Sequence, residues 1–140
     1  MRILIVNGVN LGLLGSREVD VYGATRFEDY LSVLSNKFSG VSLDYFQSDK
    51  LEELVDAIHK GEGYDGVVLN PGAYTHTSLV LADAVKAIRT RVVEVHITNL
   101  FAREQYRRKS CLAGVCCGFI AGFGLNGYDL AIQSFLSIKP

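Results

Sequence analysis

Two kinds of hydrophobic pattern alternate along this chain of 140 residues. Five short runs are rich in Val, Ile and Leu, and several are almost continuously apolar, as strands covered on both faces are. They lie at residues 2–6, 41–46, 66–69, 92–97 and 115–121. Between them, apolar residues recur every three or four positions, which is the spacing of an amphipathic helix. The alternation predicts strands and helices in turn.

Four of the intervening segments predict helices with one apolar face. Thr25 and Glu28 have the spacing of a capping box, and Ser48 or Asp49 is placed to cap the second helix. A shorter, polar helix is expected over residues 102–109. The apolar positions of the four helices are, in chain order, Phe27, Tyr30, Leu31, Leu34 and Phe38; Leu51, Leu54, Val55 and Ile58; Val80, Ala84, Ala87 and Ile88; Tyr128, Ala131, Ile132 and Phe135.

Repeated strand–helix units predict a single α/β domain over residues 1–140. Such units form a parallel sheet with right-handed crossovers and helices on both faces. Five strands favour the flavodoxin-like order 2-1-3-4-5, a three-layer sandwich. Sheets of this kind bind ligands at the carboxyl ends of their strands, beside the point where the strand order reverses. In this order that point lies between the first and third strands.

Polar residues gather after three of the predicted strands. Asn7 and Asn10 follow the first strand, residues 70–77 (NPGAYTHT) follow the third, and Glu94 and His96 close the fourth. Each asparagine alone is better explained as a turn residue that satisfies local backbone groups. Because the carboxyl ends of parallel strands meet at one edge, their convergence predicts a polar pocket.

Glu94 and His96 are two residues apart on a strand and therefore share one face. A charged side chain in a buried strand is costly unless it is paired. A glutamate that orients an imidazole is a common arrangement for acid–base chemistry. The alternative is a structural ion pair between Glu94 and a helix arginine.

The start of the third helix lies within the polar stretch. Thr75 and Thr77 are expected to cap this helix, whose free N–H groups attract anions. His76 can reach a hydroxyl or carboxylate there, and Arg107 on the short polar helix can lie over the same pocket. The polar stretch itself has neither a G-x-G-x-x-G nor a P-loop pattern, so a nucleotide phosphate site is not indicated there.

Composition narrows the function classes. Fourteen basic against 15 acidic residues give a net charge of −1, which does not favour nucleic acid or an anionic membrane as a partner. The local cluster Arg103, Arg107, Arg108 and Lys109 is typical of a solvated helix end. Neither a membrane span nor a signal peptide is recognised, so a cytoplasmic location is expected. Three cysteines match no zinc or C-x-x-C spacing, which predicts reduced thiols, with Cys116 and Cys117 buried.

Five blocks together resemble the type II 3-dehydroquinate dehydratases (type II dehydroquinases): NGVNLGLLGSREVDVYG, LNPGAYTHTS, VEVHITN, AREQYRRKS and GFGLNGY. The resemblance covers nearly the whole chain, in order. It implies a flavodoxin-like fold, a dodecamer built from trimers and no cofactor. The implied reaction is the reversible dehydration of 3-dehydroquinate to 3-dehydroshikimate, by anti elimination through an enolate. It serves the shikimate pathway of aromatic amino acid biosynthesis, and a role in quinate catabolism stays open.

The resemblance also implies roles for the polar residues. Tyr22 matches the base that removes the proton next to the ketone, and Arg17 matches its essential neighbour on a closing lid. Asn10 matches the asparagine that helps to hold a water against the enolate. His96, oriented by Glu94, matches the acid that protonates the departing hydroxyl. The positions matched to substrate binding are Asn70, His76, Asp83, Ile97, Thr98 and Arg107, with Asp83 reaching the site of a neighbouring subunit.

The chemistry of these residue types agrees with the implied route. A tyrosine with its ordinary pKa of about 10 needs help to ionise at neutral pH, and a nearby guanidinium such as that of Arg17 favours the phenolate. The other known solution is a lysine Schiff base, and no lysine lies at the carboxyl end of a predicted strand.

Two departures from the family pattern bear on the lid. Val9 and Val19 stand where relatives commonly have proline, so we expect the lid to be less rigid and the first place for disorder without ligand. Two other function classes are considered. A flavodoxin-type binding module needs a Ser/Thr-rich phosphate loop where residues 11–15 read LGLLG. An inactive relative used for assembly is disfavoured by the intact set of implied catalytic residues.

Overall fold

The computed structural model describes residues 1–16, 18, 20 and 23–137. Its five strands form one sheet in which all neighbours are parallel, in the order β2-β1-β3-β4-β5. The predicted fold class, a parallel α/β sheet of order 2-1-3-4-5, is confirmed. The strands are β1 (Arg2–Asn7), β2 (Ser42–Gln47), β3 (Gly66–Asn70), β4 (Val92–His96) and β5 (Gly118–Ala121).

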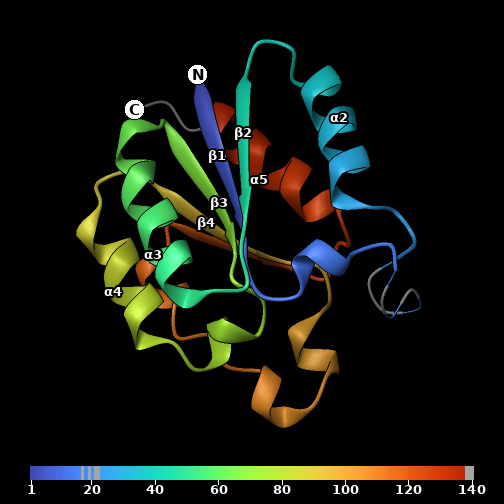
Figure 1. Cartoon of the computed structure of the whole chain (residues 1–140), viewed down its shortest axis with the longest axis vertical. Coiled ribbons are helices and arrows are strands. Elements are labelled where there is room, and N and C mark those ends of the chain that lie inside the picture. Colours follow the sequence, from blue (N-terminus) through green and yellow to red (C-terminus); the bar gives the residue numbers. More distant parts are fainter. Residues whose placement is uncertain (17, 19, 21–22, 138–140) are drawn as a thin grey trace.

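In the described part of the chain, α-helices cover both faces of the sheet (Figure 1). Helices α2 (Phe27–Lys37) and α5 (Asn126–Ser137) lie on one face. Helices α3 (Leu51–Lys60) and α4 (Leu79–Ala87) lie on the other. The result is the predicted three-layer sandwich, with its central strands removed from water.

The alternation of side chains along the strands divides the core into two parts. On β1, Ile3 and Ile5 join the cluster beneath α2 and α5, whereas Leu4 and Val6 join the cluster beneath α3 and α4. All four are 6% exposed or less. Burial on both faces explains why the central strands read as continuous apolar runs rather than alternating ones.

Most predicted apolar helix faces are buried, but the predicted caps are wrong. Helix α2 begins at Phe27 behind Arg26, and no side chain caps it, so the spacing of Thr25 and Glu28 does not make a capping box. Helix α3 begins at Leu51 without a side-chain cap. The side chain of Ser48 instead accepts a hydrogen bond from the N–H of Lys50, just before the helix.

The start of α4 also differs from the prediction. Ser78 caps it and accepts a hydrogen bond from the N–H of Leu81 at 3.0 Å. Thr75 lies earlier, in the 3₁₀ turn η3 (Gly72–His76), and Thr77 follows that turn. Val80, expected on the apolar face, is 53% exposed, whereas Ala84 is buried as predicted. Residues 72–76 therefore form a separate turn over the end of β3.

Three further expectations are corrected. The last strand begins at Gly118, because residues 113–115 form a 3₁₀ turn. The expected polar helix over 102–109 is replaced by two 3₁₀ turns, η4 (Leu100–Ala102) and η5 (Gln105–Arg107). The cysteines are free, but Cys117 is exposed rather than buried and Cys116 is half-buried. Burial, with the nearby charge of Glu94, raises the pKa of Cys116 to about 12, so this thiol stays protonated.

A close backbone approach joins the ends of β1 and β3. The N–H of Gly8 donates to the carbonyl of Asn70 at 2.7 Å. A Cβ atom at Gly8 would lie 2.4 Å from the carbonyl oxygen of Pro71, so only glycine fits. This contact brings the two polar loops predicted to meet at the strand ends into one place.

Candidate active site

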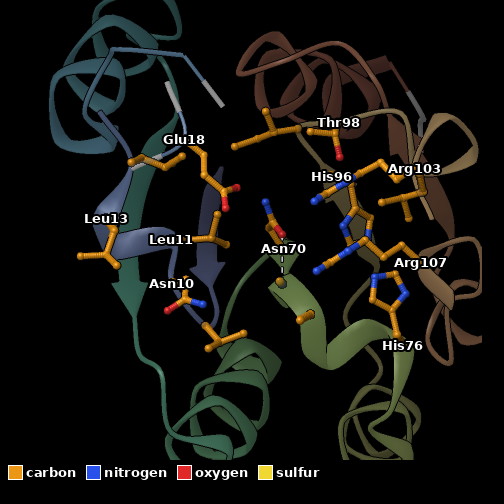
Figure 2. A pocket seen from close by; sticks show the side chains of 16 residues that line it. Asn10, Leu11, Leu13, Glu18, Asn70, His76, His96, Thr98, Arg103 and Arg107 are labelled. Carbon is orange, nitrogen blue, oxygen red and sulfur yellow. Dashed lines mark hydrogen bonds between the residues drawn. The ribbon is translucent and has the colours of Figure 1, made fainter. Parts of the chain in front are cut away.

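A pocket opens at the carboxyl ends of β1, β3 and β4, between two walls (Figure 2). Asn70 and residues 72–73 form its floor. One side, here called the β1 wall, consists of Val9, Asn10, Leu11, Leu13, Leu14 and Glu18. The opposite side, here called the β4 wall, consists of His76, His96, Ile97, Thr98, Leu100, Arg103 and Arg107. The predicted polar pocket at the strand ends is therefore present.

His96 is held against Glu94 at the end of β4. The His96 Nε2 and Glu94 Oε1 atoms are 2.6 Å apart, and both side chains are almost fully buried. A carboxylate can only accept, so Nε2–H donates and the ring's other nitrogen is left for the pocket that His96 lines. The ring of Phe119 on β5 lies 5.5 Å from the imidazole, centroid to centroid. The Glu94–His96 couple predicted from their spacing is thus formed.

Two hydroxyl groups also contact the carboxylate of Glu94. Thr75 donates to Oε1, and Ser110 Oγ lies 2.9 Å from each carboxylate oxygen. The alternative prediction was an ion pair between Glu94 and a helix arginine. The contacts of Glu94 are instead with His96 and the two hydroxyl groups. The sequence predicted Thr75 as a helix cap and gave Ser110 no role of its own, although Ser110 closes the block AREQYRRKS.

Two arginines of the β4 wall share one carboxylate. Arg107 Nε lies 3.0 Å from Glu104 Oε2, and Arg103 Nε lies 3.9 Å from the same oxygen. A backbone hydrogen bond and these two positive charges hold the pKa of Glu104 below its ordinary value. Arg107 was predicted at the pocket, but Arg103 was assigned to a solvated helix end. Both arginines line the pocket, although the helix over 102–109 on which they were expected does not form.

His76 faces the same space from η3. Its Nδ1 atom lies 2.6 Å from the carbonyl oxygen of Lys109, so Nδ1–H donates and Nε2 is left to meet a ligand. Thr98 lies beyond His96 on the same wall, and the carbonyl of Ile97 accepts from the N–H of Gly124 at 2.9 Å. These predicted substrate-binding positions are brought together.

Asn70, on the floor, is fixed in orientation by a buried network. Its Nδ2 donates to the hydroxyl of Tyr128 at 2.8 Å, and its Oδ1 accepts from the N–H of Gly72 at 3.1 Å. The Tyr128 hydroxyl in turn donates to Asn7 Oδ1 at 2.8 Å. Burial raises the pKa of Tyr128 far above its ordinary value, so this hydroxyl stays protonated. Asn70 therefore keeps one amide hydrogen for a ligand's oxygen.

The β1 wall begins with Asn10 in the left-handed backbone region, at φ 66°. Its N–H donates to Asp49 Oδ1 at 2.9 Å, and the turn η1 (Leu11–Leu13) follows. Leu11 and Leu14 are each 6% exposed and pack into the core beneath α2 and α5. Asn10 is thus at the pocket as predicted.

Three residues predicted for the lid lie outside the described residues: Arg17, Val19 and Tyr22. Glu18, which sequence reasoning did not select, lines the pocket, and so does Val9. Asp83 is exposed on α4 and does not line the pocket of its own chain.

Within the described ranges, no group of three or more His, Cys, Asp and Glu side chains is placed to hold a metal ion. No helix of the described part has both the length and the hydropathy needed to cross a membrane.

The chain is similar to known dehydroquinases both in sequence and in structure. Residues 1–136 match the family model described as dehydroquinase class II. A 3-dehydroquinate dehydratase of Exiguobacterium is 49% identical over 97% of this chain and 94% of its own length. The 3-dehydroquinate dehydratase of Pelodictyon phaeoclathratiforme is 47% identical over 100% and 97%, respectively. Among solved structures, the type II dehydroquinase of Butyrivibrio crossotus superposes with a TM-score of 0.94 at 38% identity, covering 98% of each chain.

Proposed function

The chain belongs to the class II dehydroquinase family, and we propose that it converts 3-dehydroquinate reversibly to 3-dehydroshikimate by an anti elimination through an enolate. As a 3-dehydroquinate dehydratase it is a hydro-lyase of the shikimate pathway. One C–H bond next to the ketone and one C–O bond break, and water leaves. The two bonds break on opposite faces, so an acid and a base must face each other across the substrate.

The Glu94–His96 couple is the observation that carries this proposal. It presents one imidazole nitrogen to the pocket while the other is fixed on a buried carboxylate. In the elimination, His96 gives a proton to the departing hydroxyl, which then leaves as water. Glu94 stabilises the imidazolium and fixes the direction of the ring.

The base is assigned to the segment that follows the β1 wall in the sequence. Tyr22 takes the proton next to the ketone, and Arg17 favours its phenolate form; both assignments rest on the family resemblance. Electrons from the broken C–H bond move onto the ketone oxygen and form the enolate. Asn10, at the pocket on the β1 wall, helps to hold the water that stabilises this oxygen.

Substrate binding falls to the polar groups of the floor and the β4 wall. Arg107 and the neighbouring Arg103 supply positive charge at a pocket whose ligand carries a carboxylate. Asn70, His76 and Thr98 offer hydrogen-bonding groups to the substrate's oxygens. No cofactor takes part in this route.

The assembly is part of the proposal. We expect a homo-oligomer, a dodecamer built from trimers, in which Asp83 of one subunit reaches the site of its neighbour. The exposed position of Asp83 on α4 leaves its carboxylate available for such a contact.

The test is direct, because the product is a conjugated enone that absorbs in the ultraviolet. The purified chain is mixed with 3-dehydroquinate and the absorbance is followed; a rise that scales with protein concentration is expected. A flat trace at high protein concentration would contradict the function. Inactivation by borohydride only when substrate is present would indicate an imine and replace the enolate route with a lysine-dependent one.

A further inference from the structure

The carboxylate of Glu94 is the most deeply buried charge at the site, at 0% exposure. Burial disfavours a carboxylate unless hydrogen bonds replace the lost water. His96 supplies one such bond, to Oε1. The other contacts come from two hydroxyls on different parts of the chain: Thr75 on η3 and Ser110, which follows η5.

The hydrogen-bond pattern fixes which way the Ser110 hydroxyl points. Its oxygen accepts from the N–H of Leu112 and from the N–H of Ala113, each at 3.0 Å. A hydroxyl oxygen has two acceptor sites and one hydrogen. With both acceptor sites used by the backbone, the hydrogen is directed at Glu94, whose two oxygens are each 2.9 Å away.

Thr75 is constrained in the same direction. It is fully buried, and its hydroxyl lies 2.9 Å from that of Ser110 and within hydrogen-bonding distance of Glu94 Oε1. The acceptor sites of Ser110 are occupied, so the Thr75 hydrogen goes to the carboxylate. A backbone bond from Cys111 N–H to the Thr75 carbonyl, 2.7 Å long, holds the two hydroxyl-bearing segments together.

We propose that Thr75 and Ser110 are positioning residues that keep the Glu94 carboxylate aligned, and thereby hold His96 as a proton donor facing the pocket. The two hydroxyls donate to the carboxylate oxygens and so fix the orientation of the carboxylate beside the imidazole. An aligned carboxylate keeps the Nε2 proton of His96 in place and leaves the other ring nitrogen for the substrate. The proposal rests on the function proposed above, since it assigns the acid step to His96.

Kinetics of matched variants test the proposal. Thr75→Val keeps the shape of the side chain without its hydroxyl, and Ser110→Ala removes the other hydroxyl. Each is expected to lower kcat by about 10- to 100-fold with KM within about twofold, the range typical of a lost orienting partner. Thr75→Ser, which keeps the hydroxyl, should retain most of kcat. Ser78→Ala is the control, because it removes a buried hydroxyl that caps α4 and does not contact Glu94.

The outcomes separate cleanly. If folded Thr75→Val and Ser110→Ala enzymes keep kcat within twofold of the parent, or change KM alone, the proposal is overturned. Ser110 also binds two backbone N–H groups, so the kinetics of Ser110→Ala are interpreted only if circular dichroism and Tm show a folded protein. If that variant does not fold, the comparison of Thr75→Val with Thr75→Ser tests the proposal.

A second readout does not need turnover, so failure of the positioning proposal can be told from failure of the function. The proton between His96 Nε2 and Glu94 should give a downfield proton NMR signal that is missing in His96→Ala. We expect this signal to shift or broaden in Thr75→Val and Ser110→Ala, and to persist in Ser78→Ala. An unchanged signal in both hydroxyl variants overturns the proposal even if the parent turns over no dehydroquinate.

Discussion

The two walls of the pocket are built in opposite ways. On the β4 wall, polar side chains are held by partners from distant parts of the sequence: His96 by Glu94, and Glu94 by Thr75 and Ser110. On the β1 wall, leucines dominate, and two of them, Leu11 and Leu14, are anchored in the core beneath α2 and α5. Figure 2 shows Leu11 and Leu13 on one side of Asn70 and His96 on the other.

This difference suggests a division of labour. A proton donor needs a fixed direction, and the hydrogen-bonded β4 wall supplies it before any ligand arrives. The β1 wall leads into the segment that carries Arg17 and Tyr22, both outside the described residues. Apolar contacts are non-directional, so they anchor Leu11 and Leu14 in the core without fixing the direction of a polar group.

The largest effects are expected from the proton-transfer group assigned to each side. Tyr22→Phe and His96→Ala should each lower kcat by about 10²- to 10⁴-fold, the usual range for losing an acid or base; His96→Ala should also lower Tm, because it removes a partner of the buried Glu94 carboxylate. Steady-state kinetics by enone absorbance, with thermal melts, measure both. If Tyr22→Phe keeps near-normal turnover, Tyr22 is not the base; the same result for His96→Ala would remove it as the acid.

The apolar anchor of the β1 wall gives the next largest effect. Leu14→Ala removes a side chain that is 6% exposed and packed in the core beneath α2 and α5. We expect a loss of about 2–3 kcal/mol in the free energy of unfolding, as for other buried leucines. Urea denaturation measures it. A loss below about 0.5 kcal/mol would mean that Leu14 does not anchor the β1 wall in the core, and that the two walls differ less than this comparison holds.

The sequence predicted the features of the two walls that depend on strand topology, and it missed the contacts that depend on the path of an irregular segment. Strand order and the meeting of Asn10, Asn70 and His96 were predictable, because hydrophobic pattern and parallel topology place all strand ends at one edge. The contact of Ser110 with Glu94 was not, since it depends on the path of residues 100–113. That path replaces the predicted helix with 3₁₀ turns.

Helix starts failed for a related reason. Thr25 and Glu28 have a capping-box spacing, yet α2 begins after Arg26. A cap is worth about 1 kcal/mol, which packing of Phe27 and its neighbours in the core can override. Local signals are therefore reliable where they agree with burial and fail where tertiary contacts move a boundary by one or two residues.

The buried network beneath the floor should respond to loss of a single hydroxyl. Tyr128→Phe leaves Asn7 Oδ1 and one hydrogen of Asn70 Nδ2 without partners. Unpaired buried polar groups cost about 1–3 kcal/mol, and we expect a loss of stability near 1–2 kcal/mol together with a raised KM. A matched control is Tyr106→Phe, because Tyr106 is 69% exposed. Unchanged KM and unfolding midpoint in Tyr128→Phe would show that the network does not orient Asn70.

Ionisation of Tyr30, on the α2–α5 side of the sheet, is expected to lower the stability of the fold at alkaline pH. Burial, with the charge of Asp129, raises the pKa of Tyr30 to about 12 from its ordinary 10.0. A pKa raised in the folded state stabilises the fold fully below about pH 10, and this share is lost as pH rises toward 12. Urea midpoints at pH 8, 10 and 11 should therefore fall less steeply in Tyr30→Phe than in the parent. Parallel slopes would contradict the assignment.

The smallest change in stability is expected at Leu13, the neighbour that completes the contrast with Leu14. Leu13 lines the pocket but is 48% exposed, so Leu13→Ala should alter the free energy of unfolding by less than about 0.5 kcal/mol. Because Leu13 lines the pocket, removing it should raise KM several-fold and leave stability alone. The urea midpoint and KM of the one variant separate these effects. An unchanged KM would restrict the role of the β1 wall in substrate binding to its other residues.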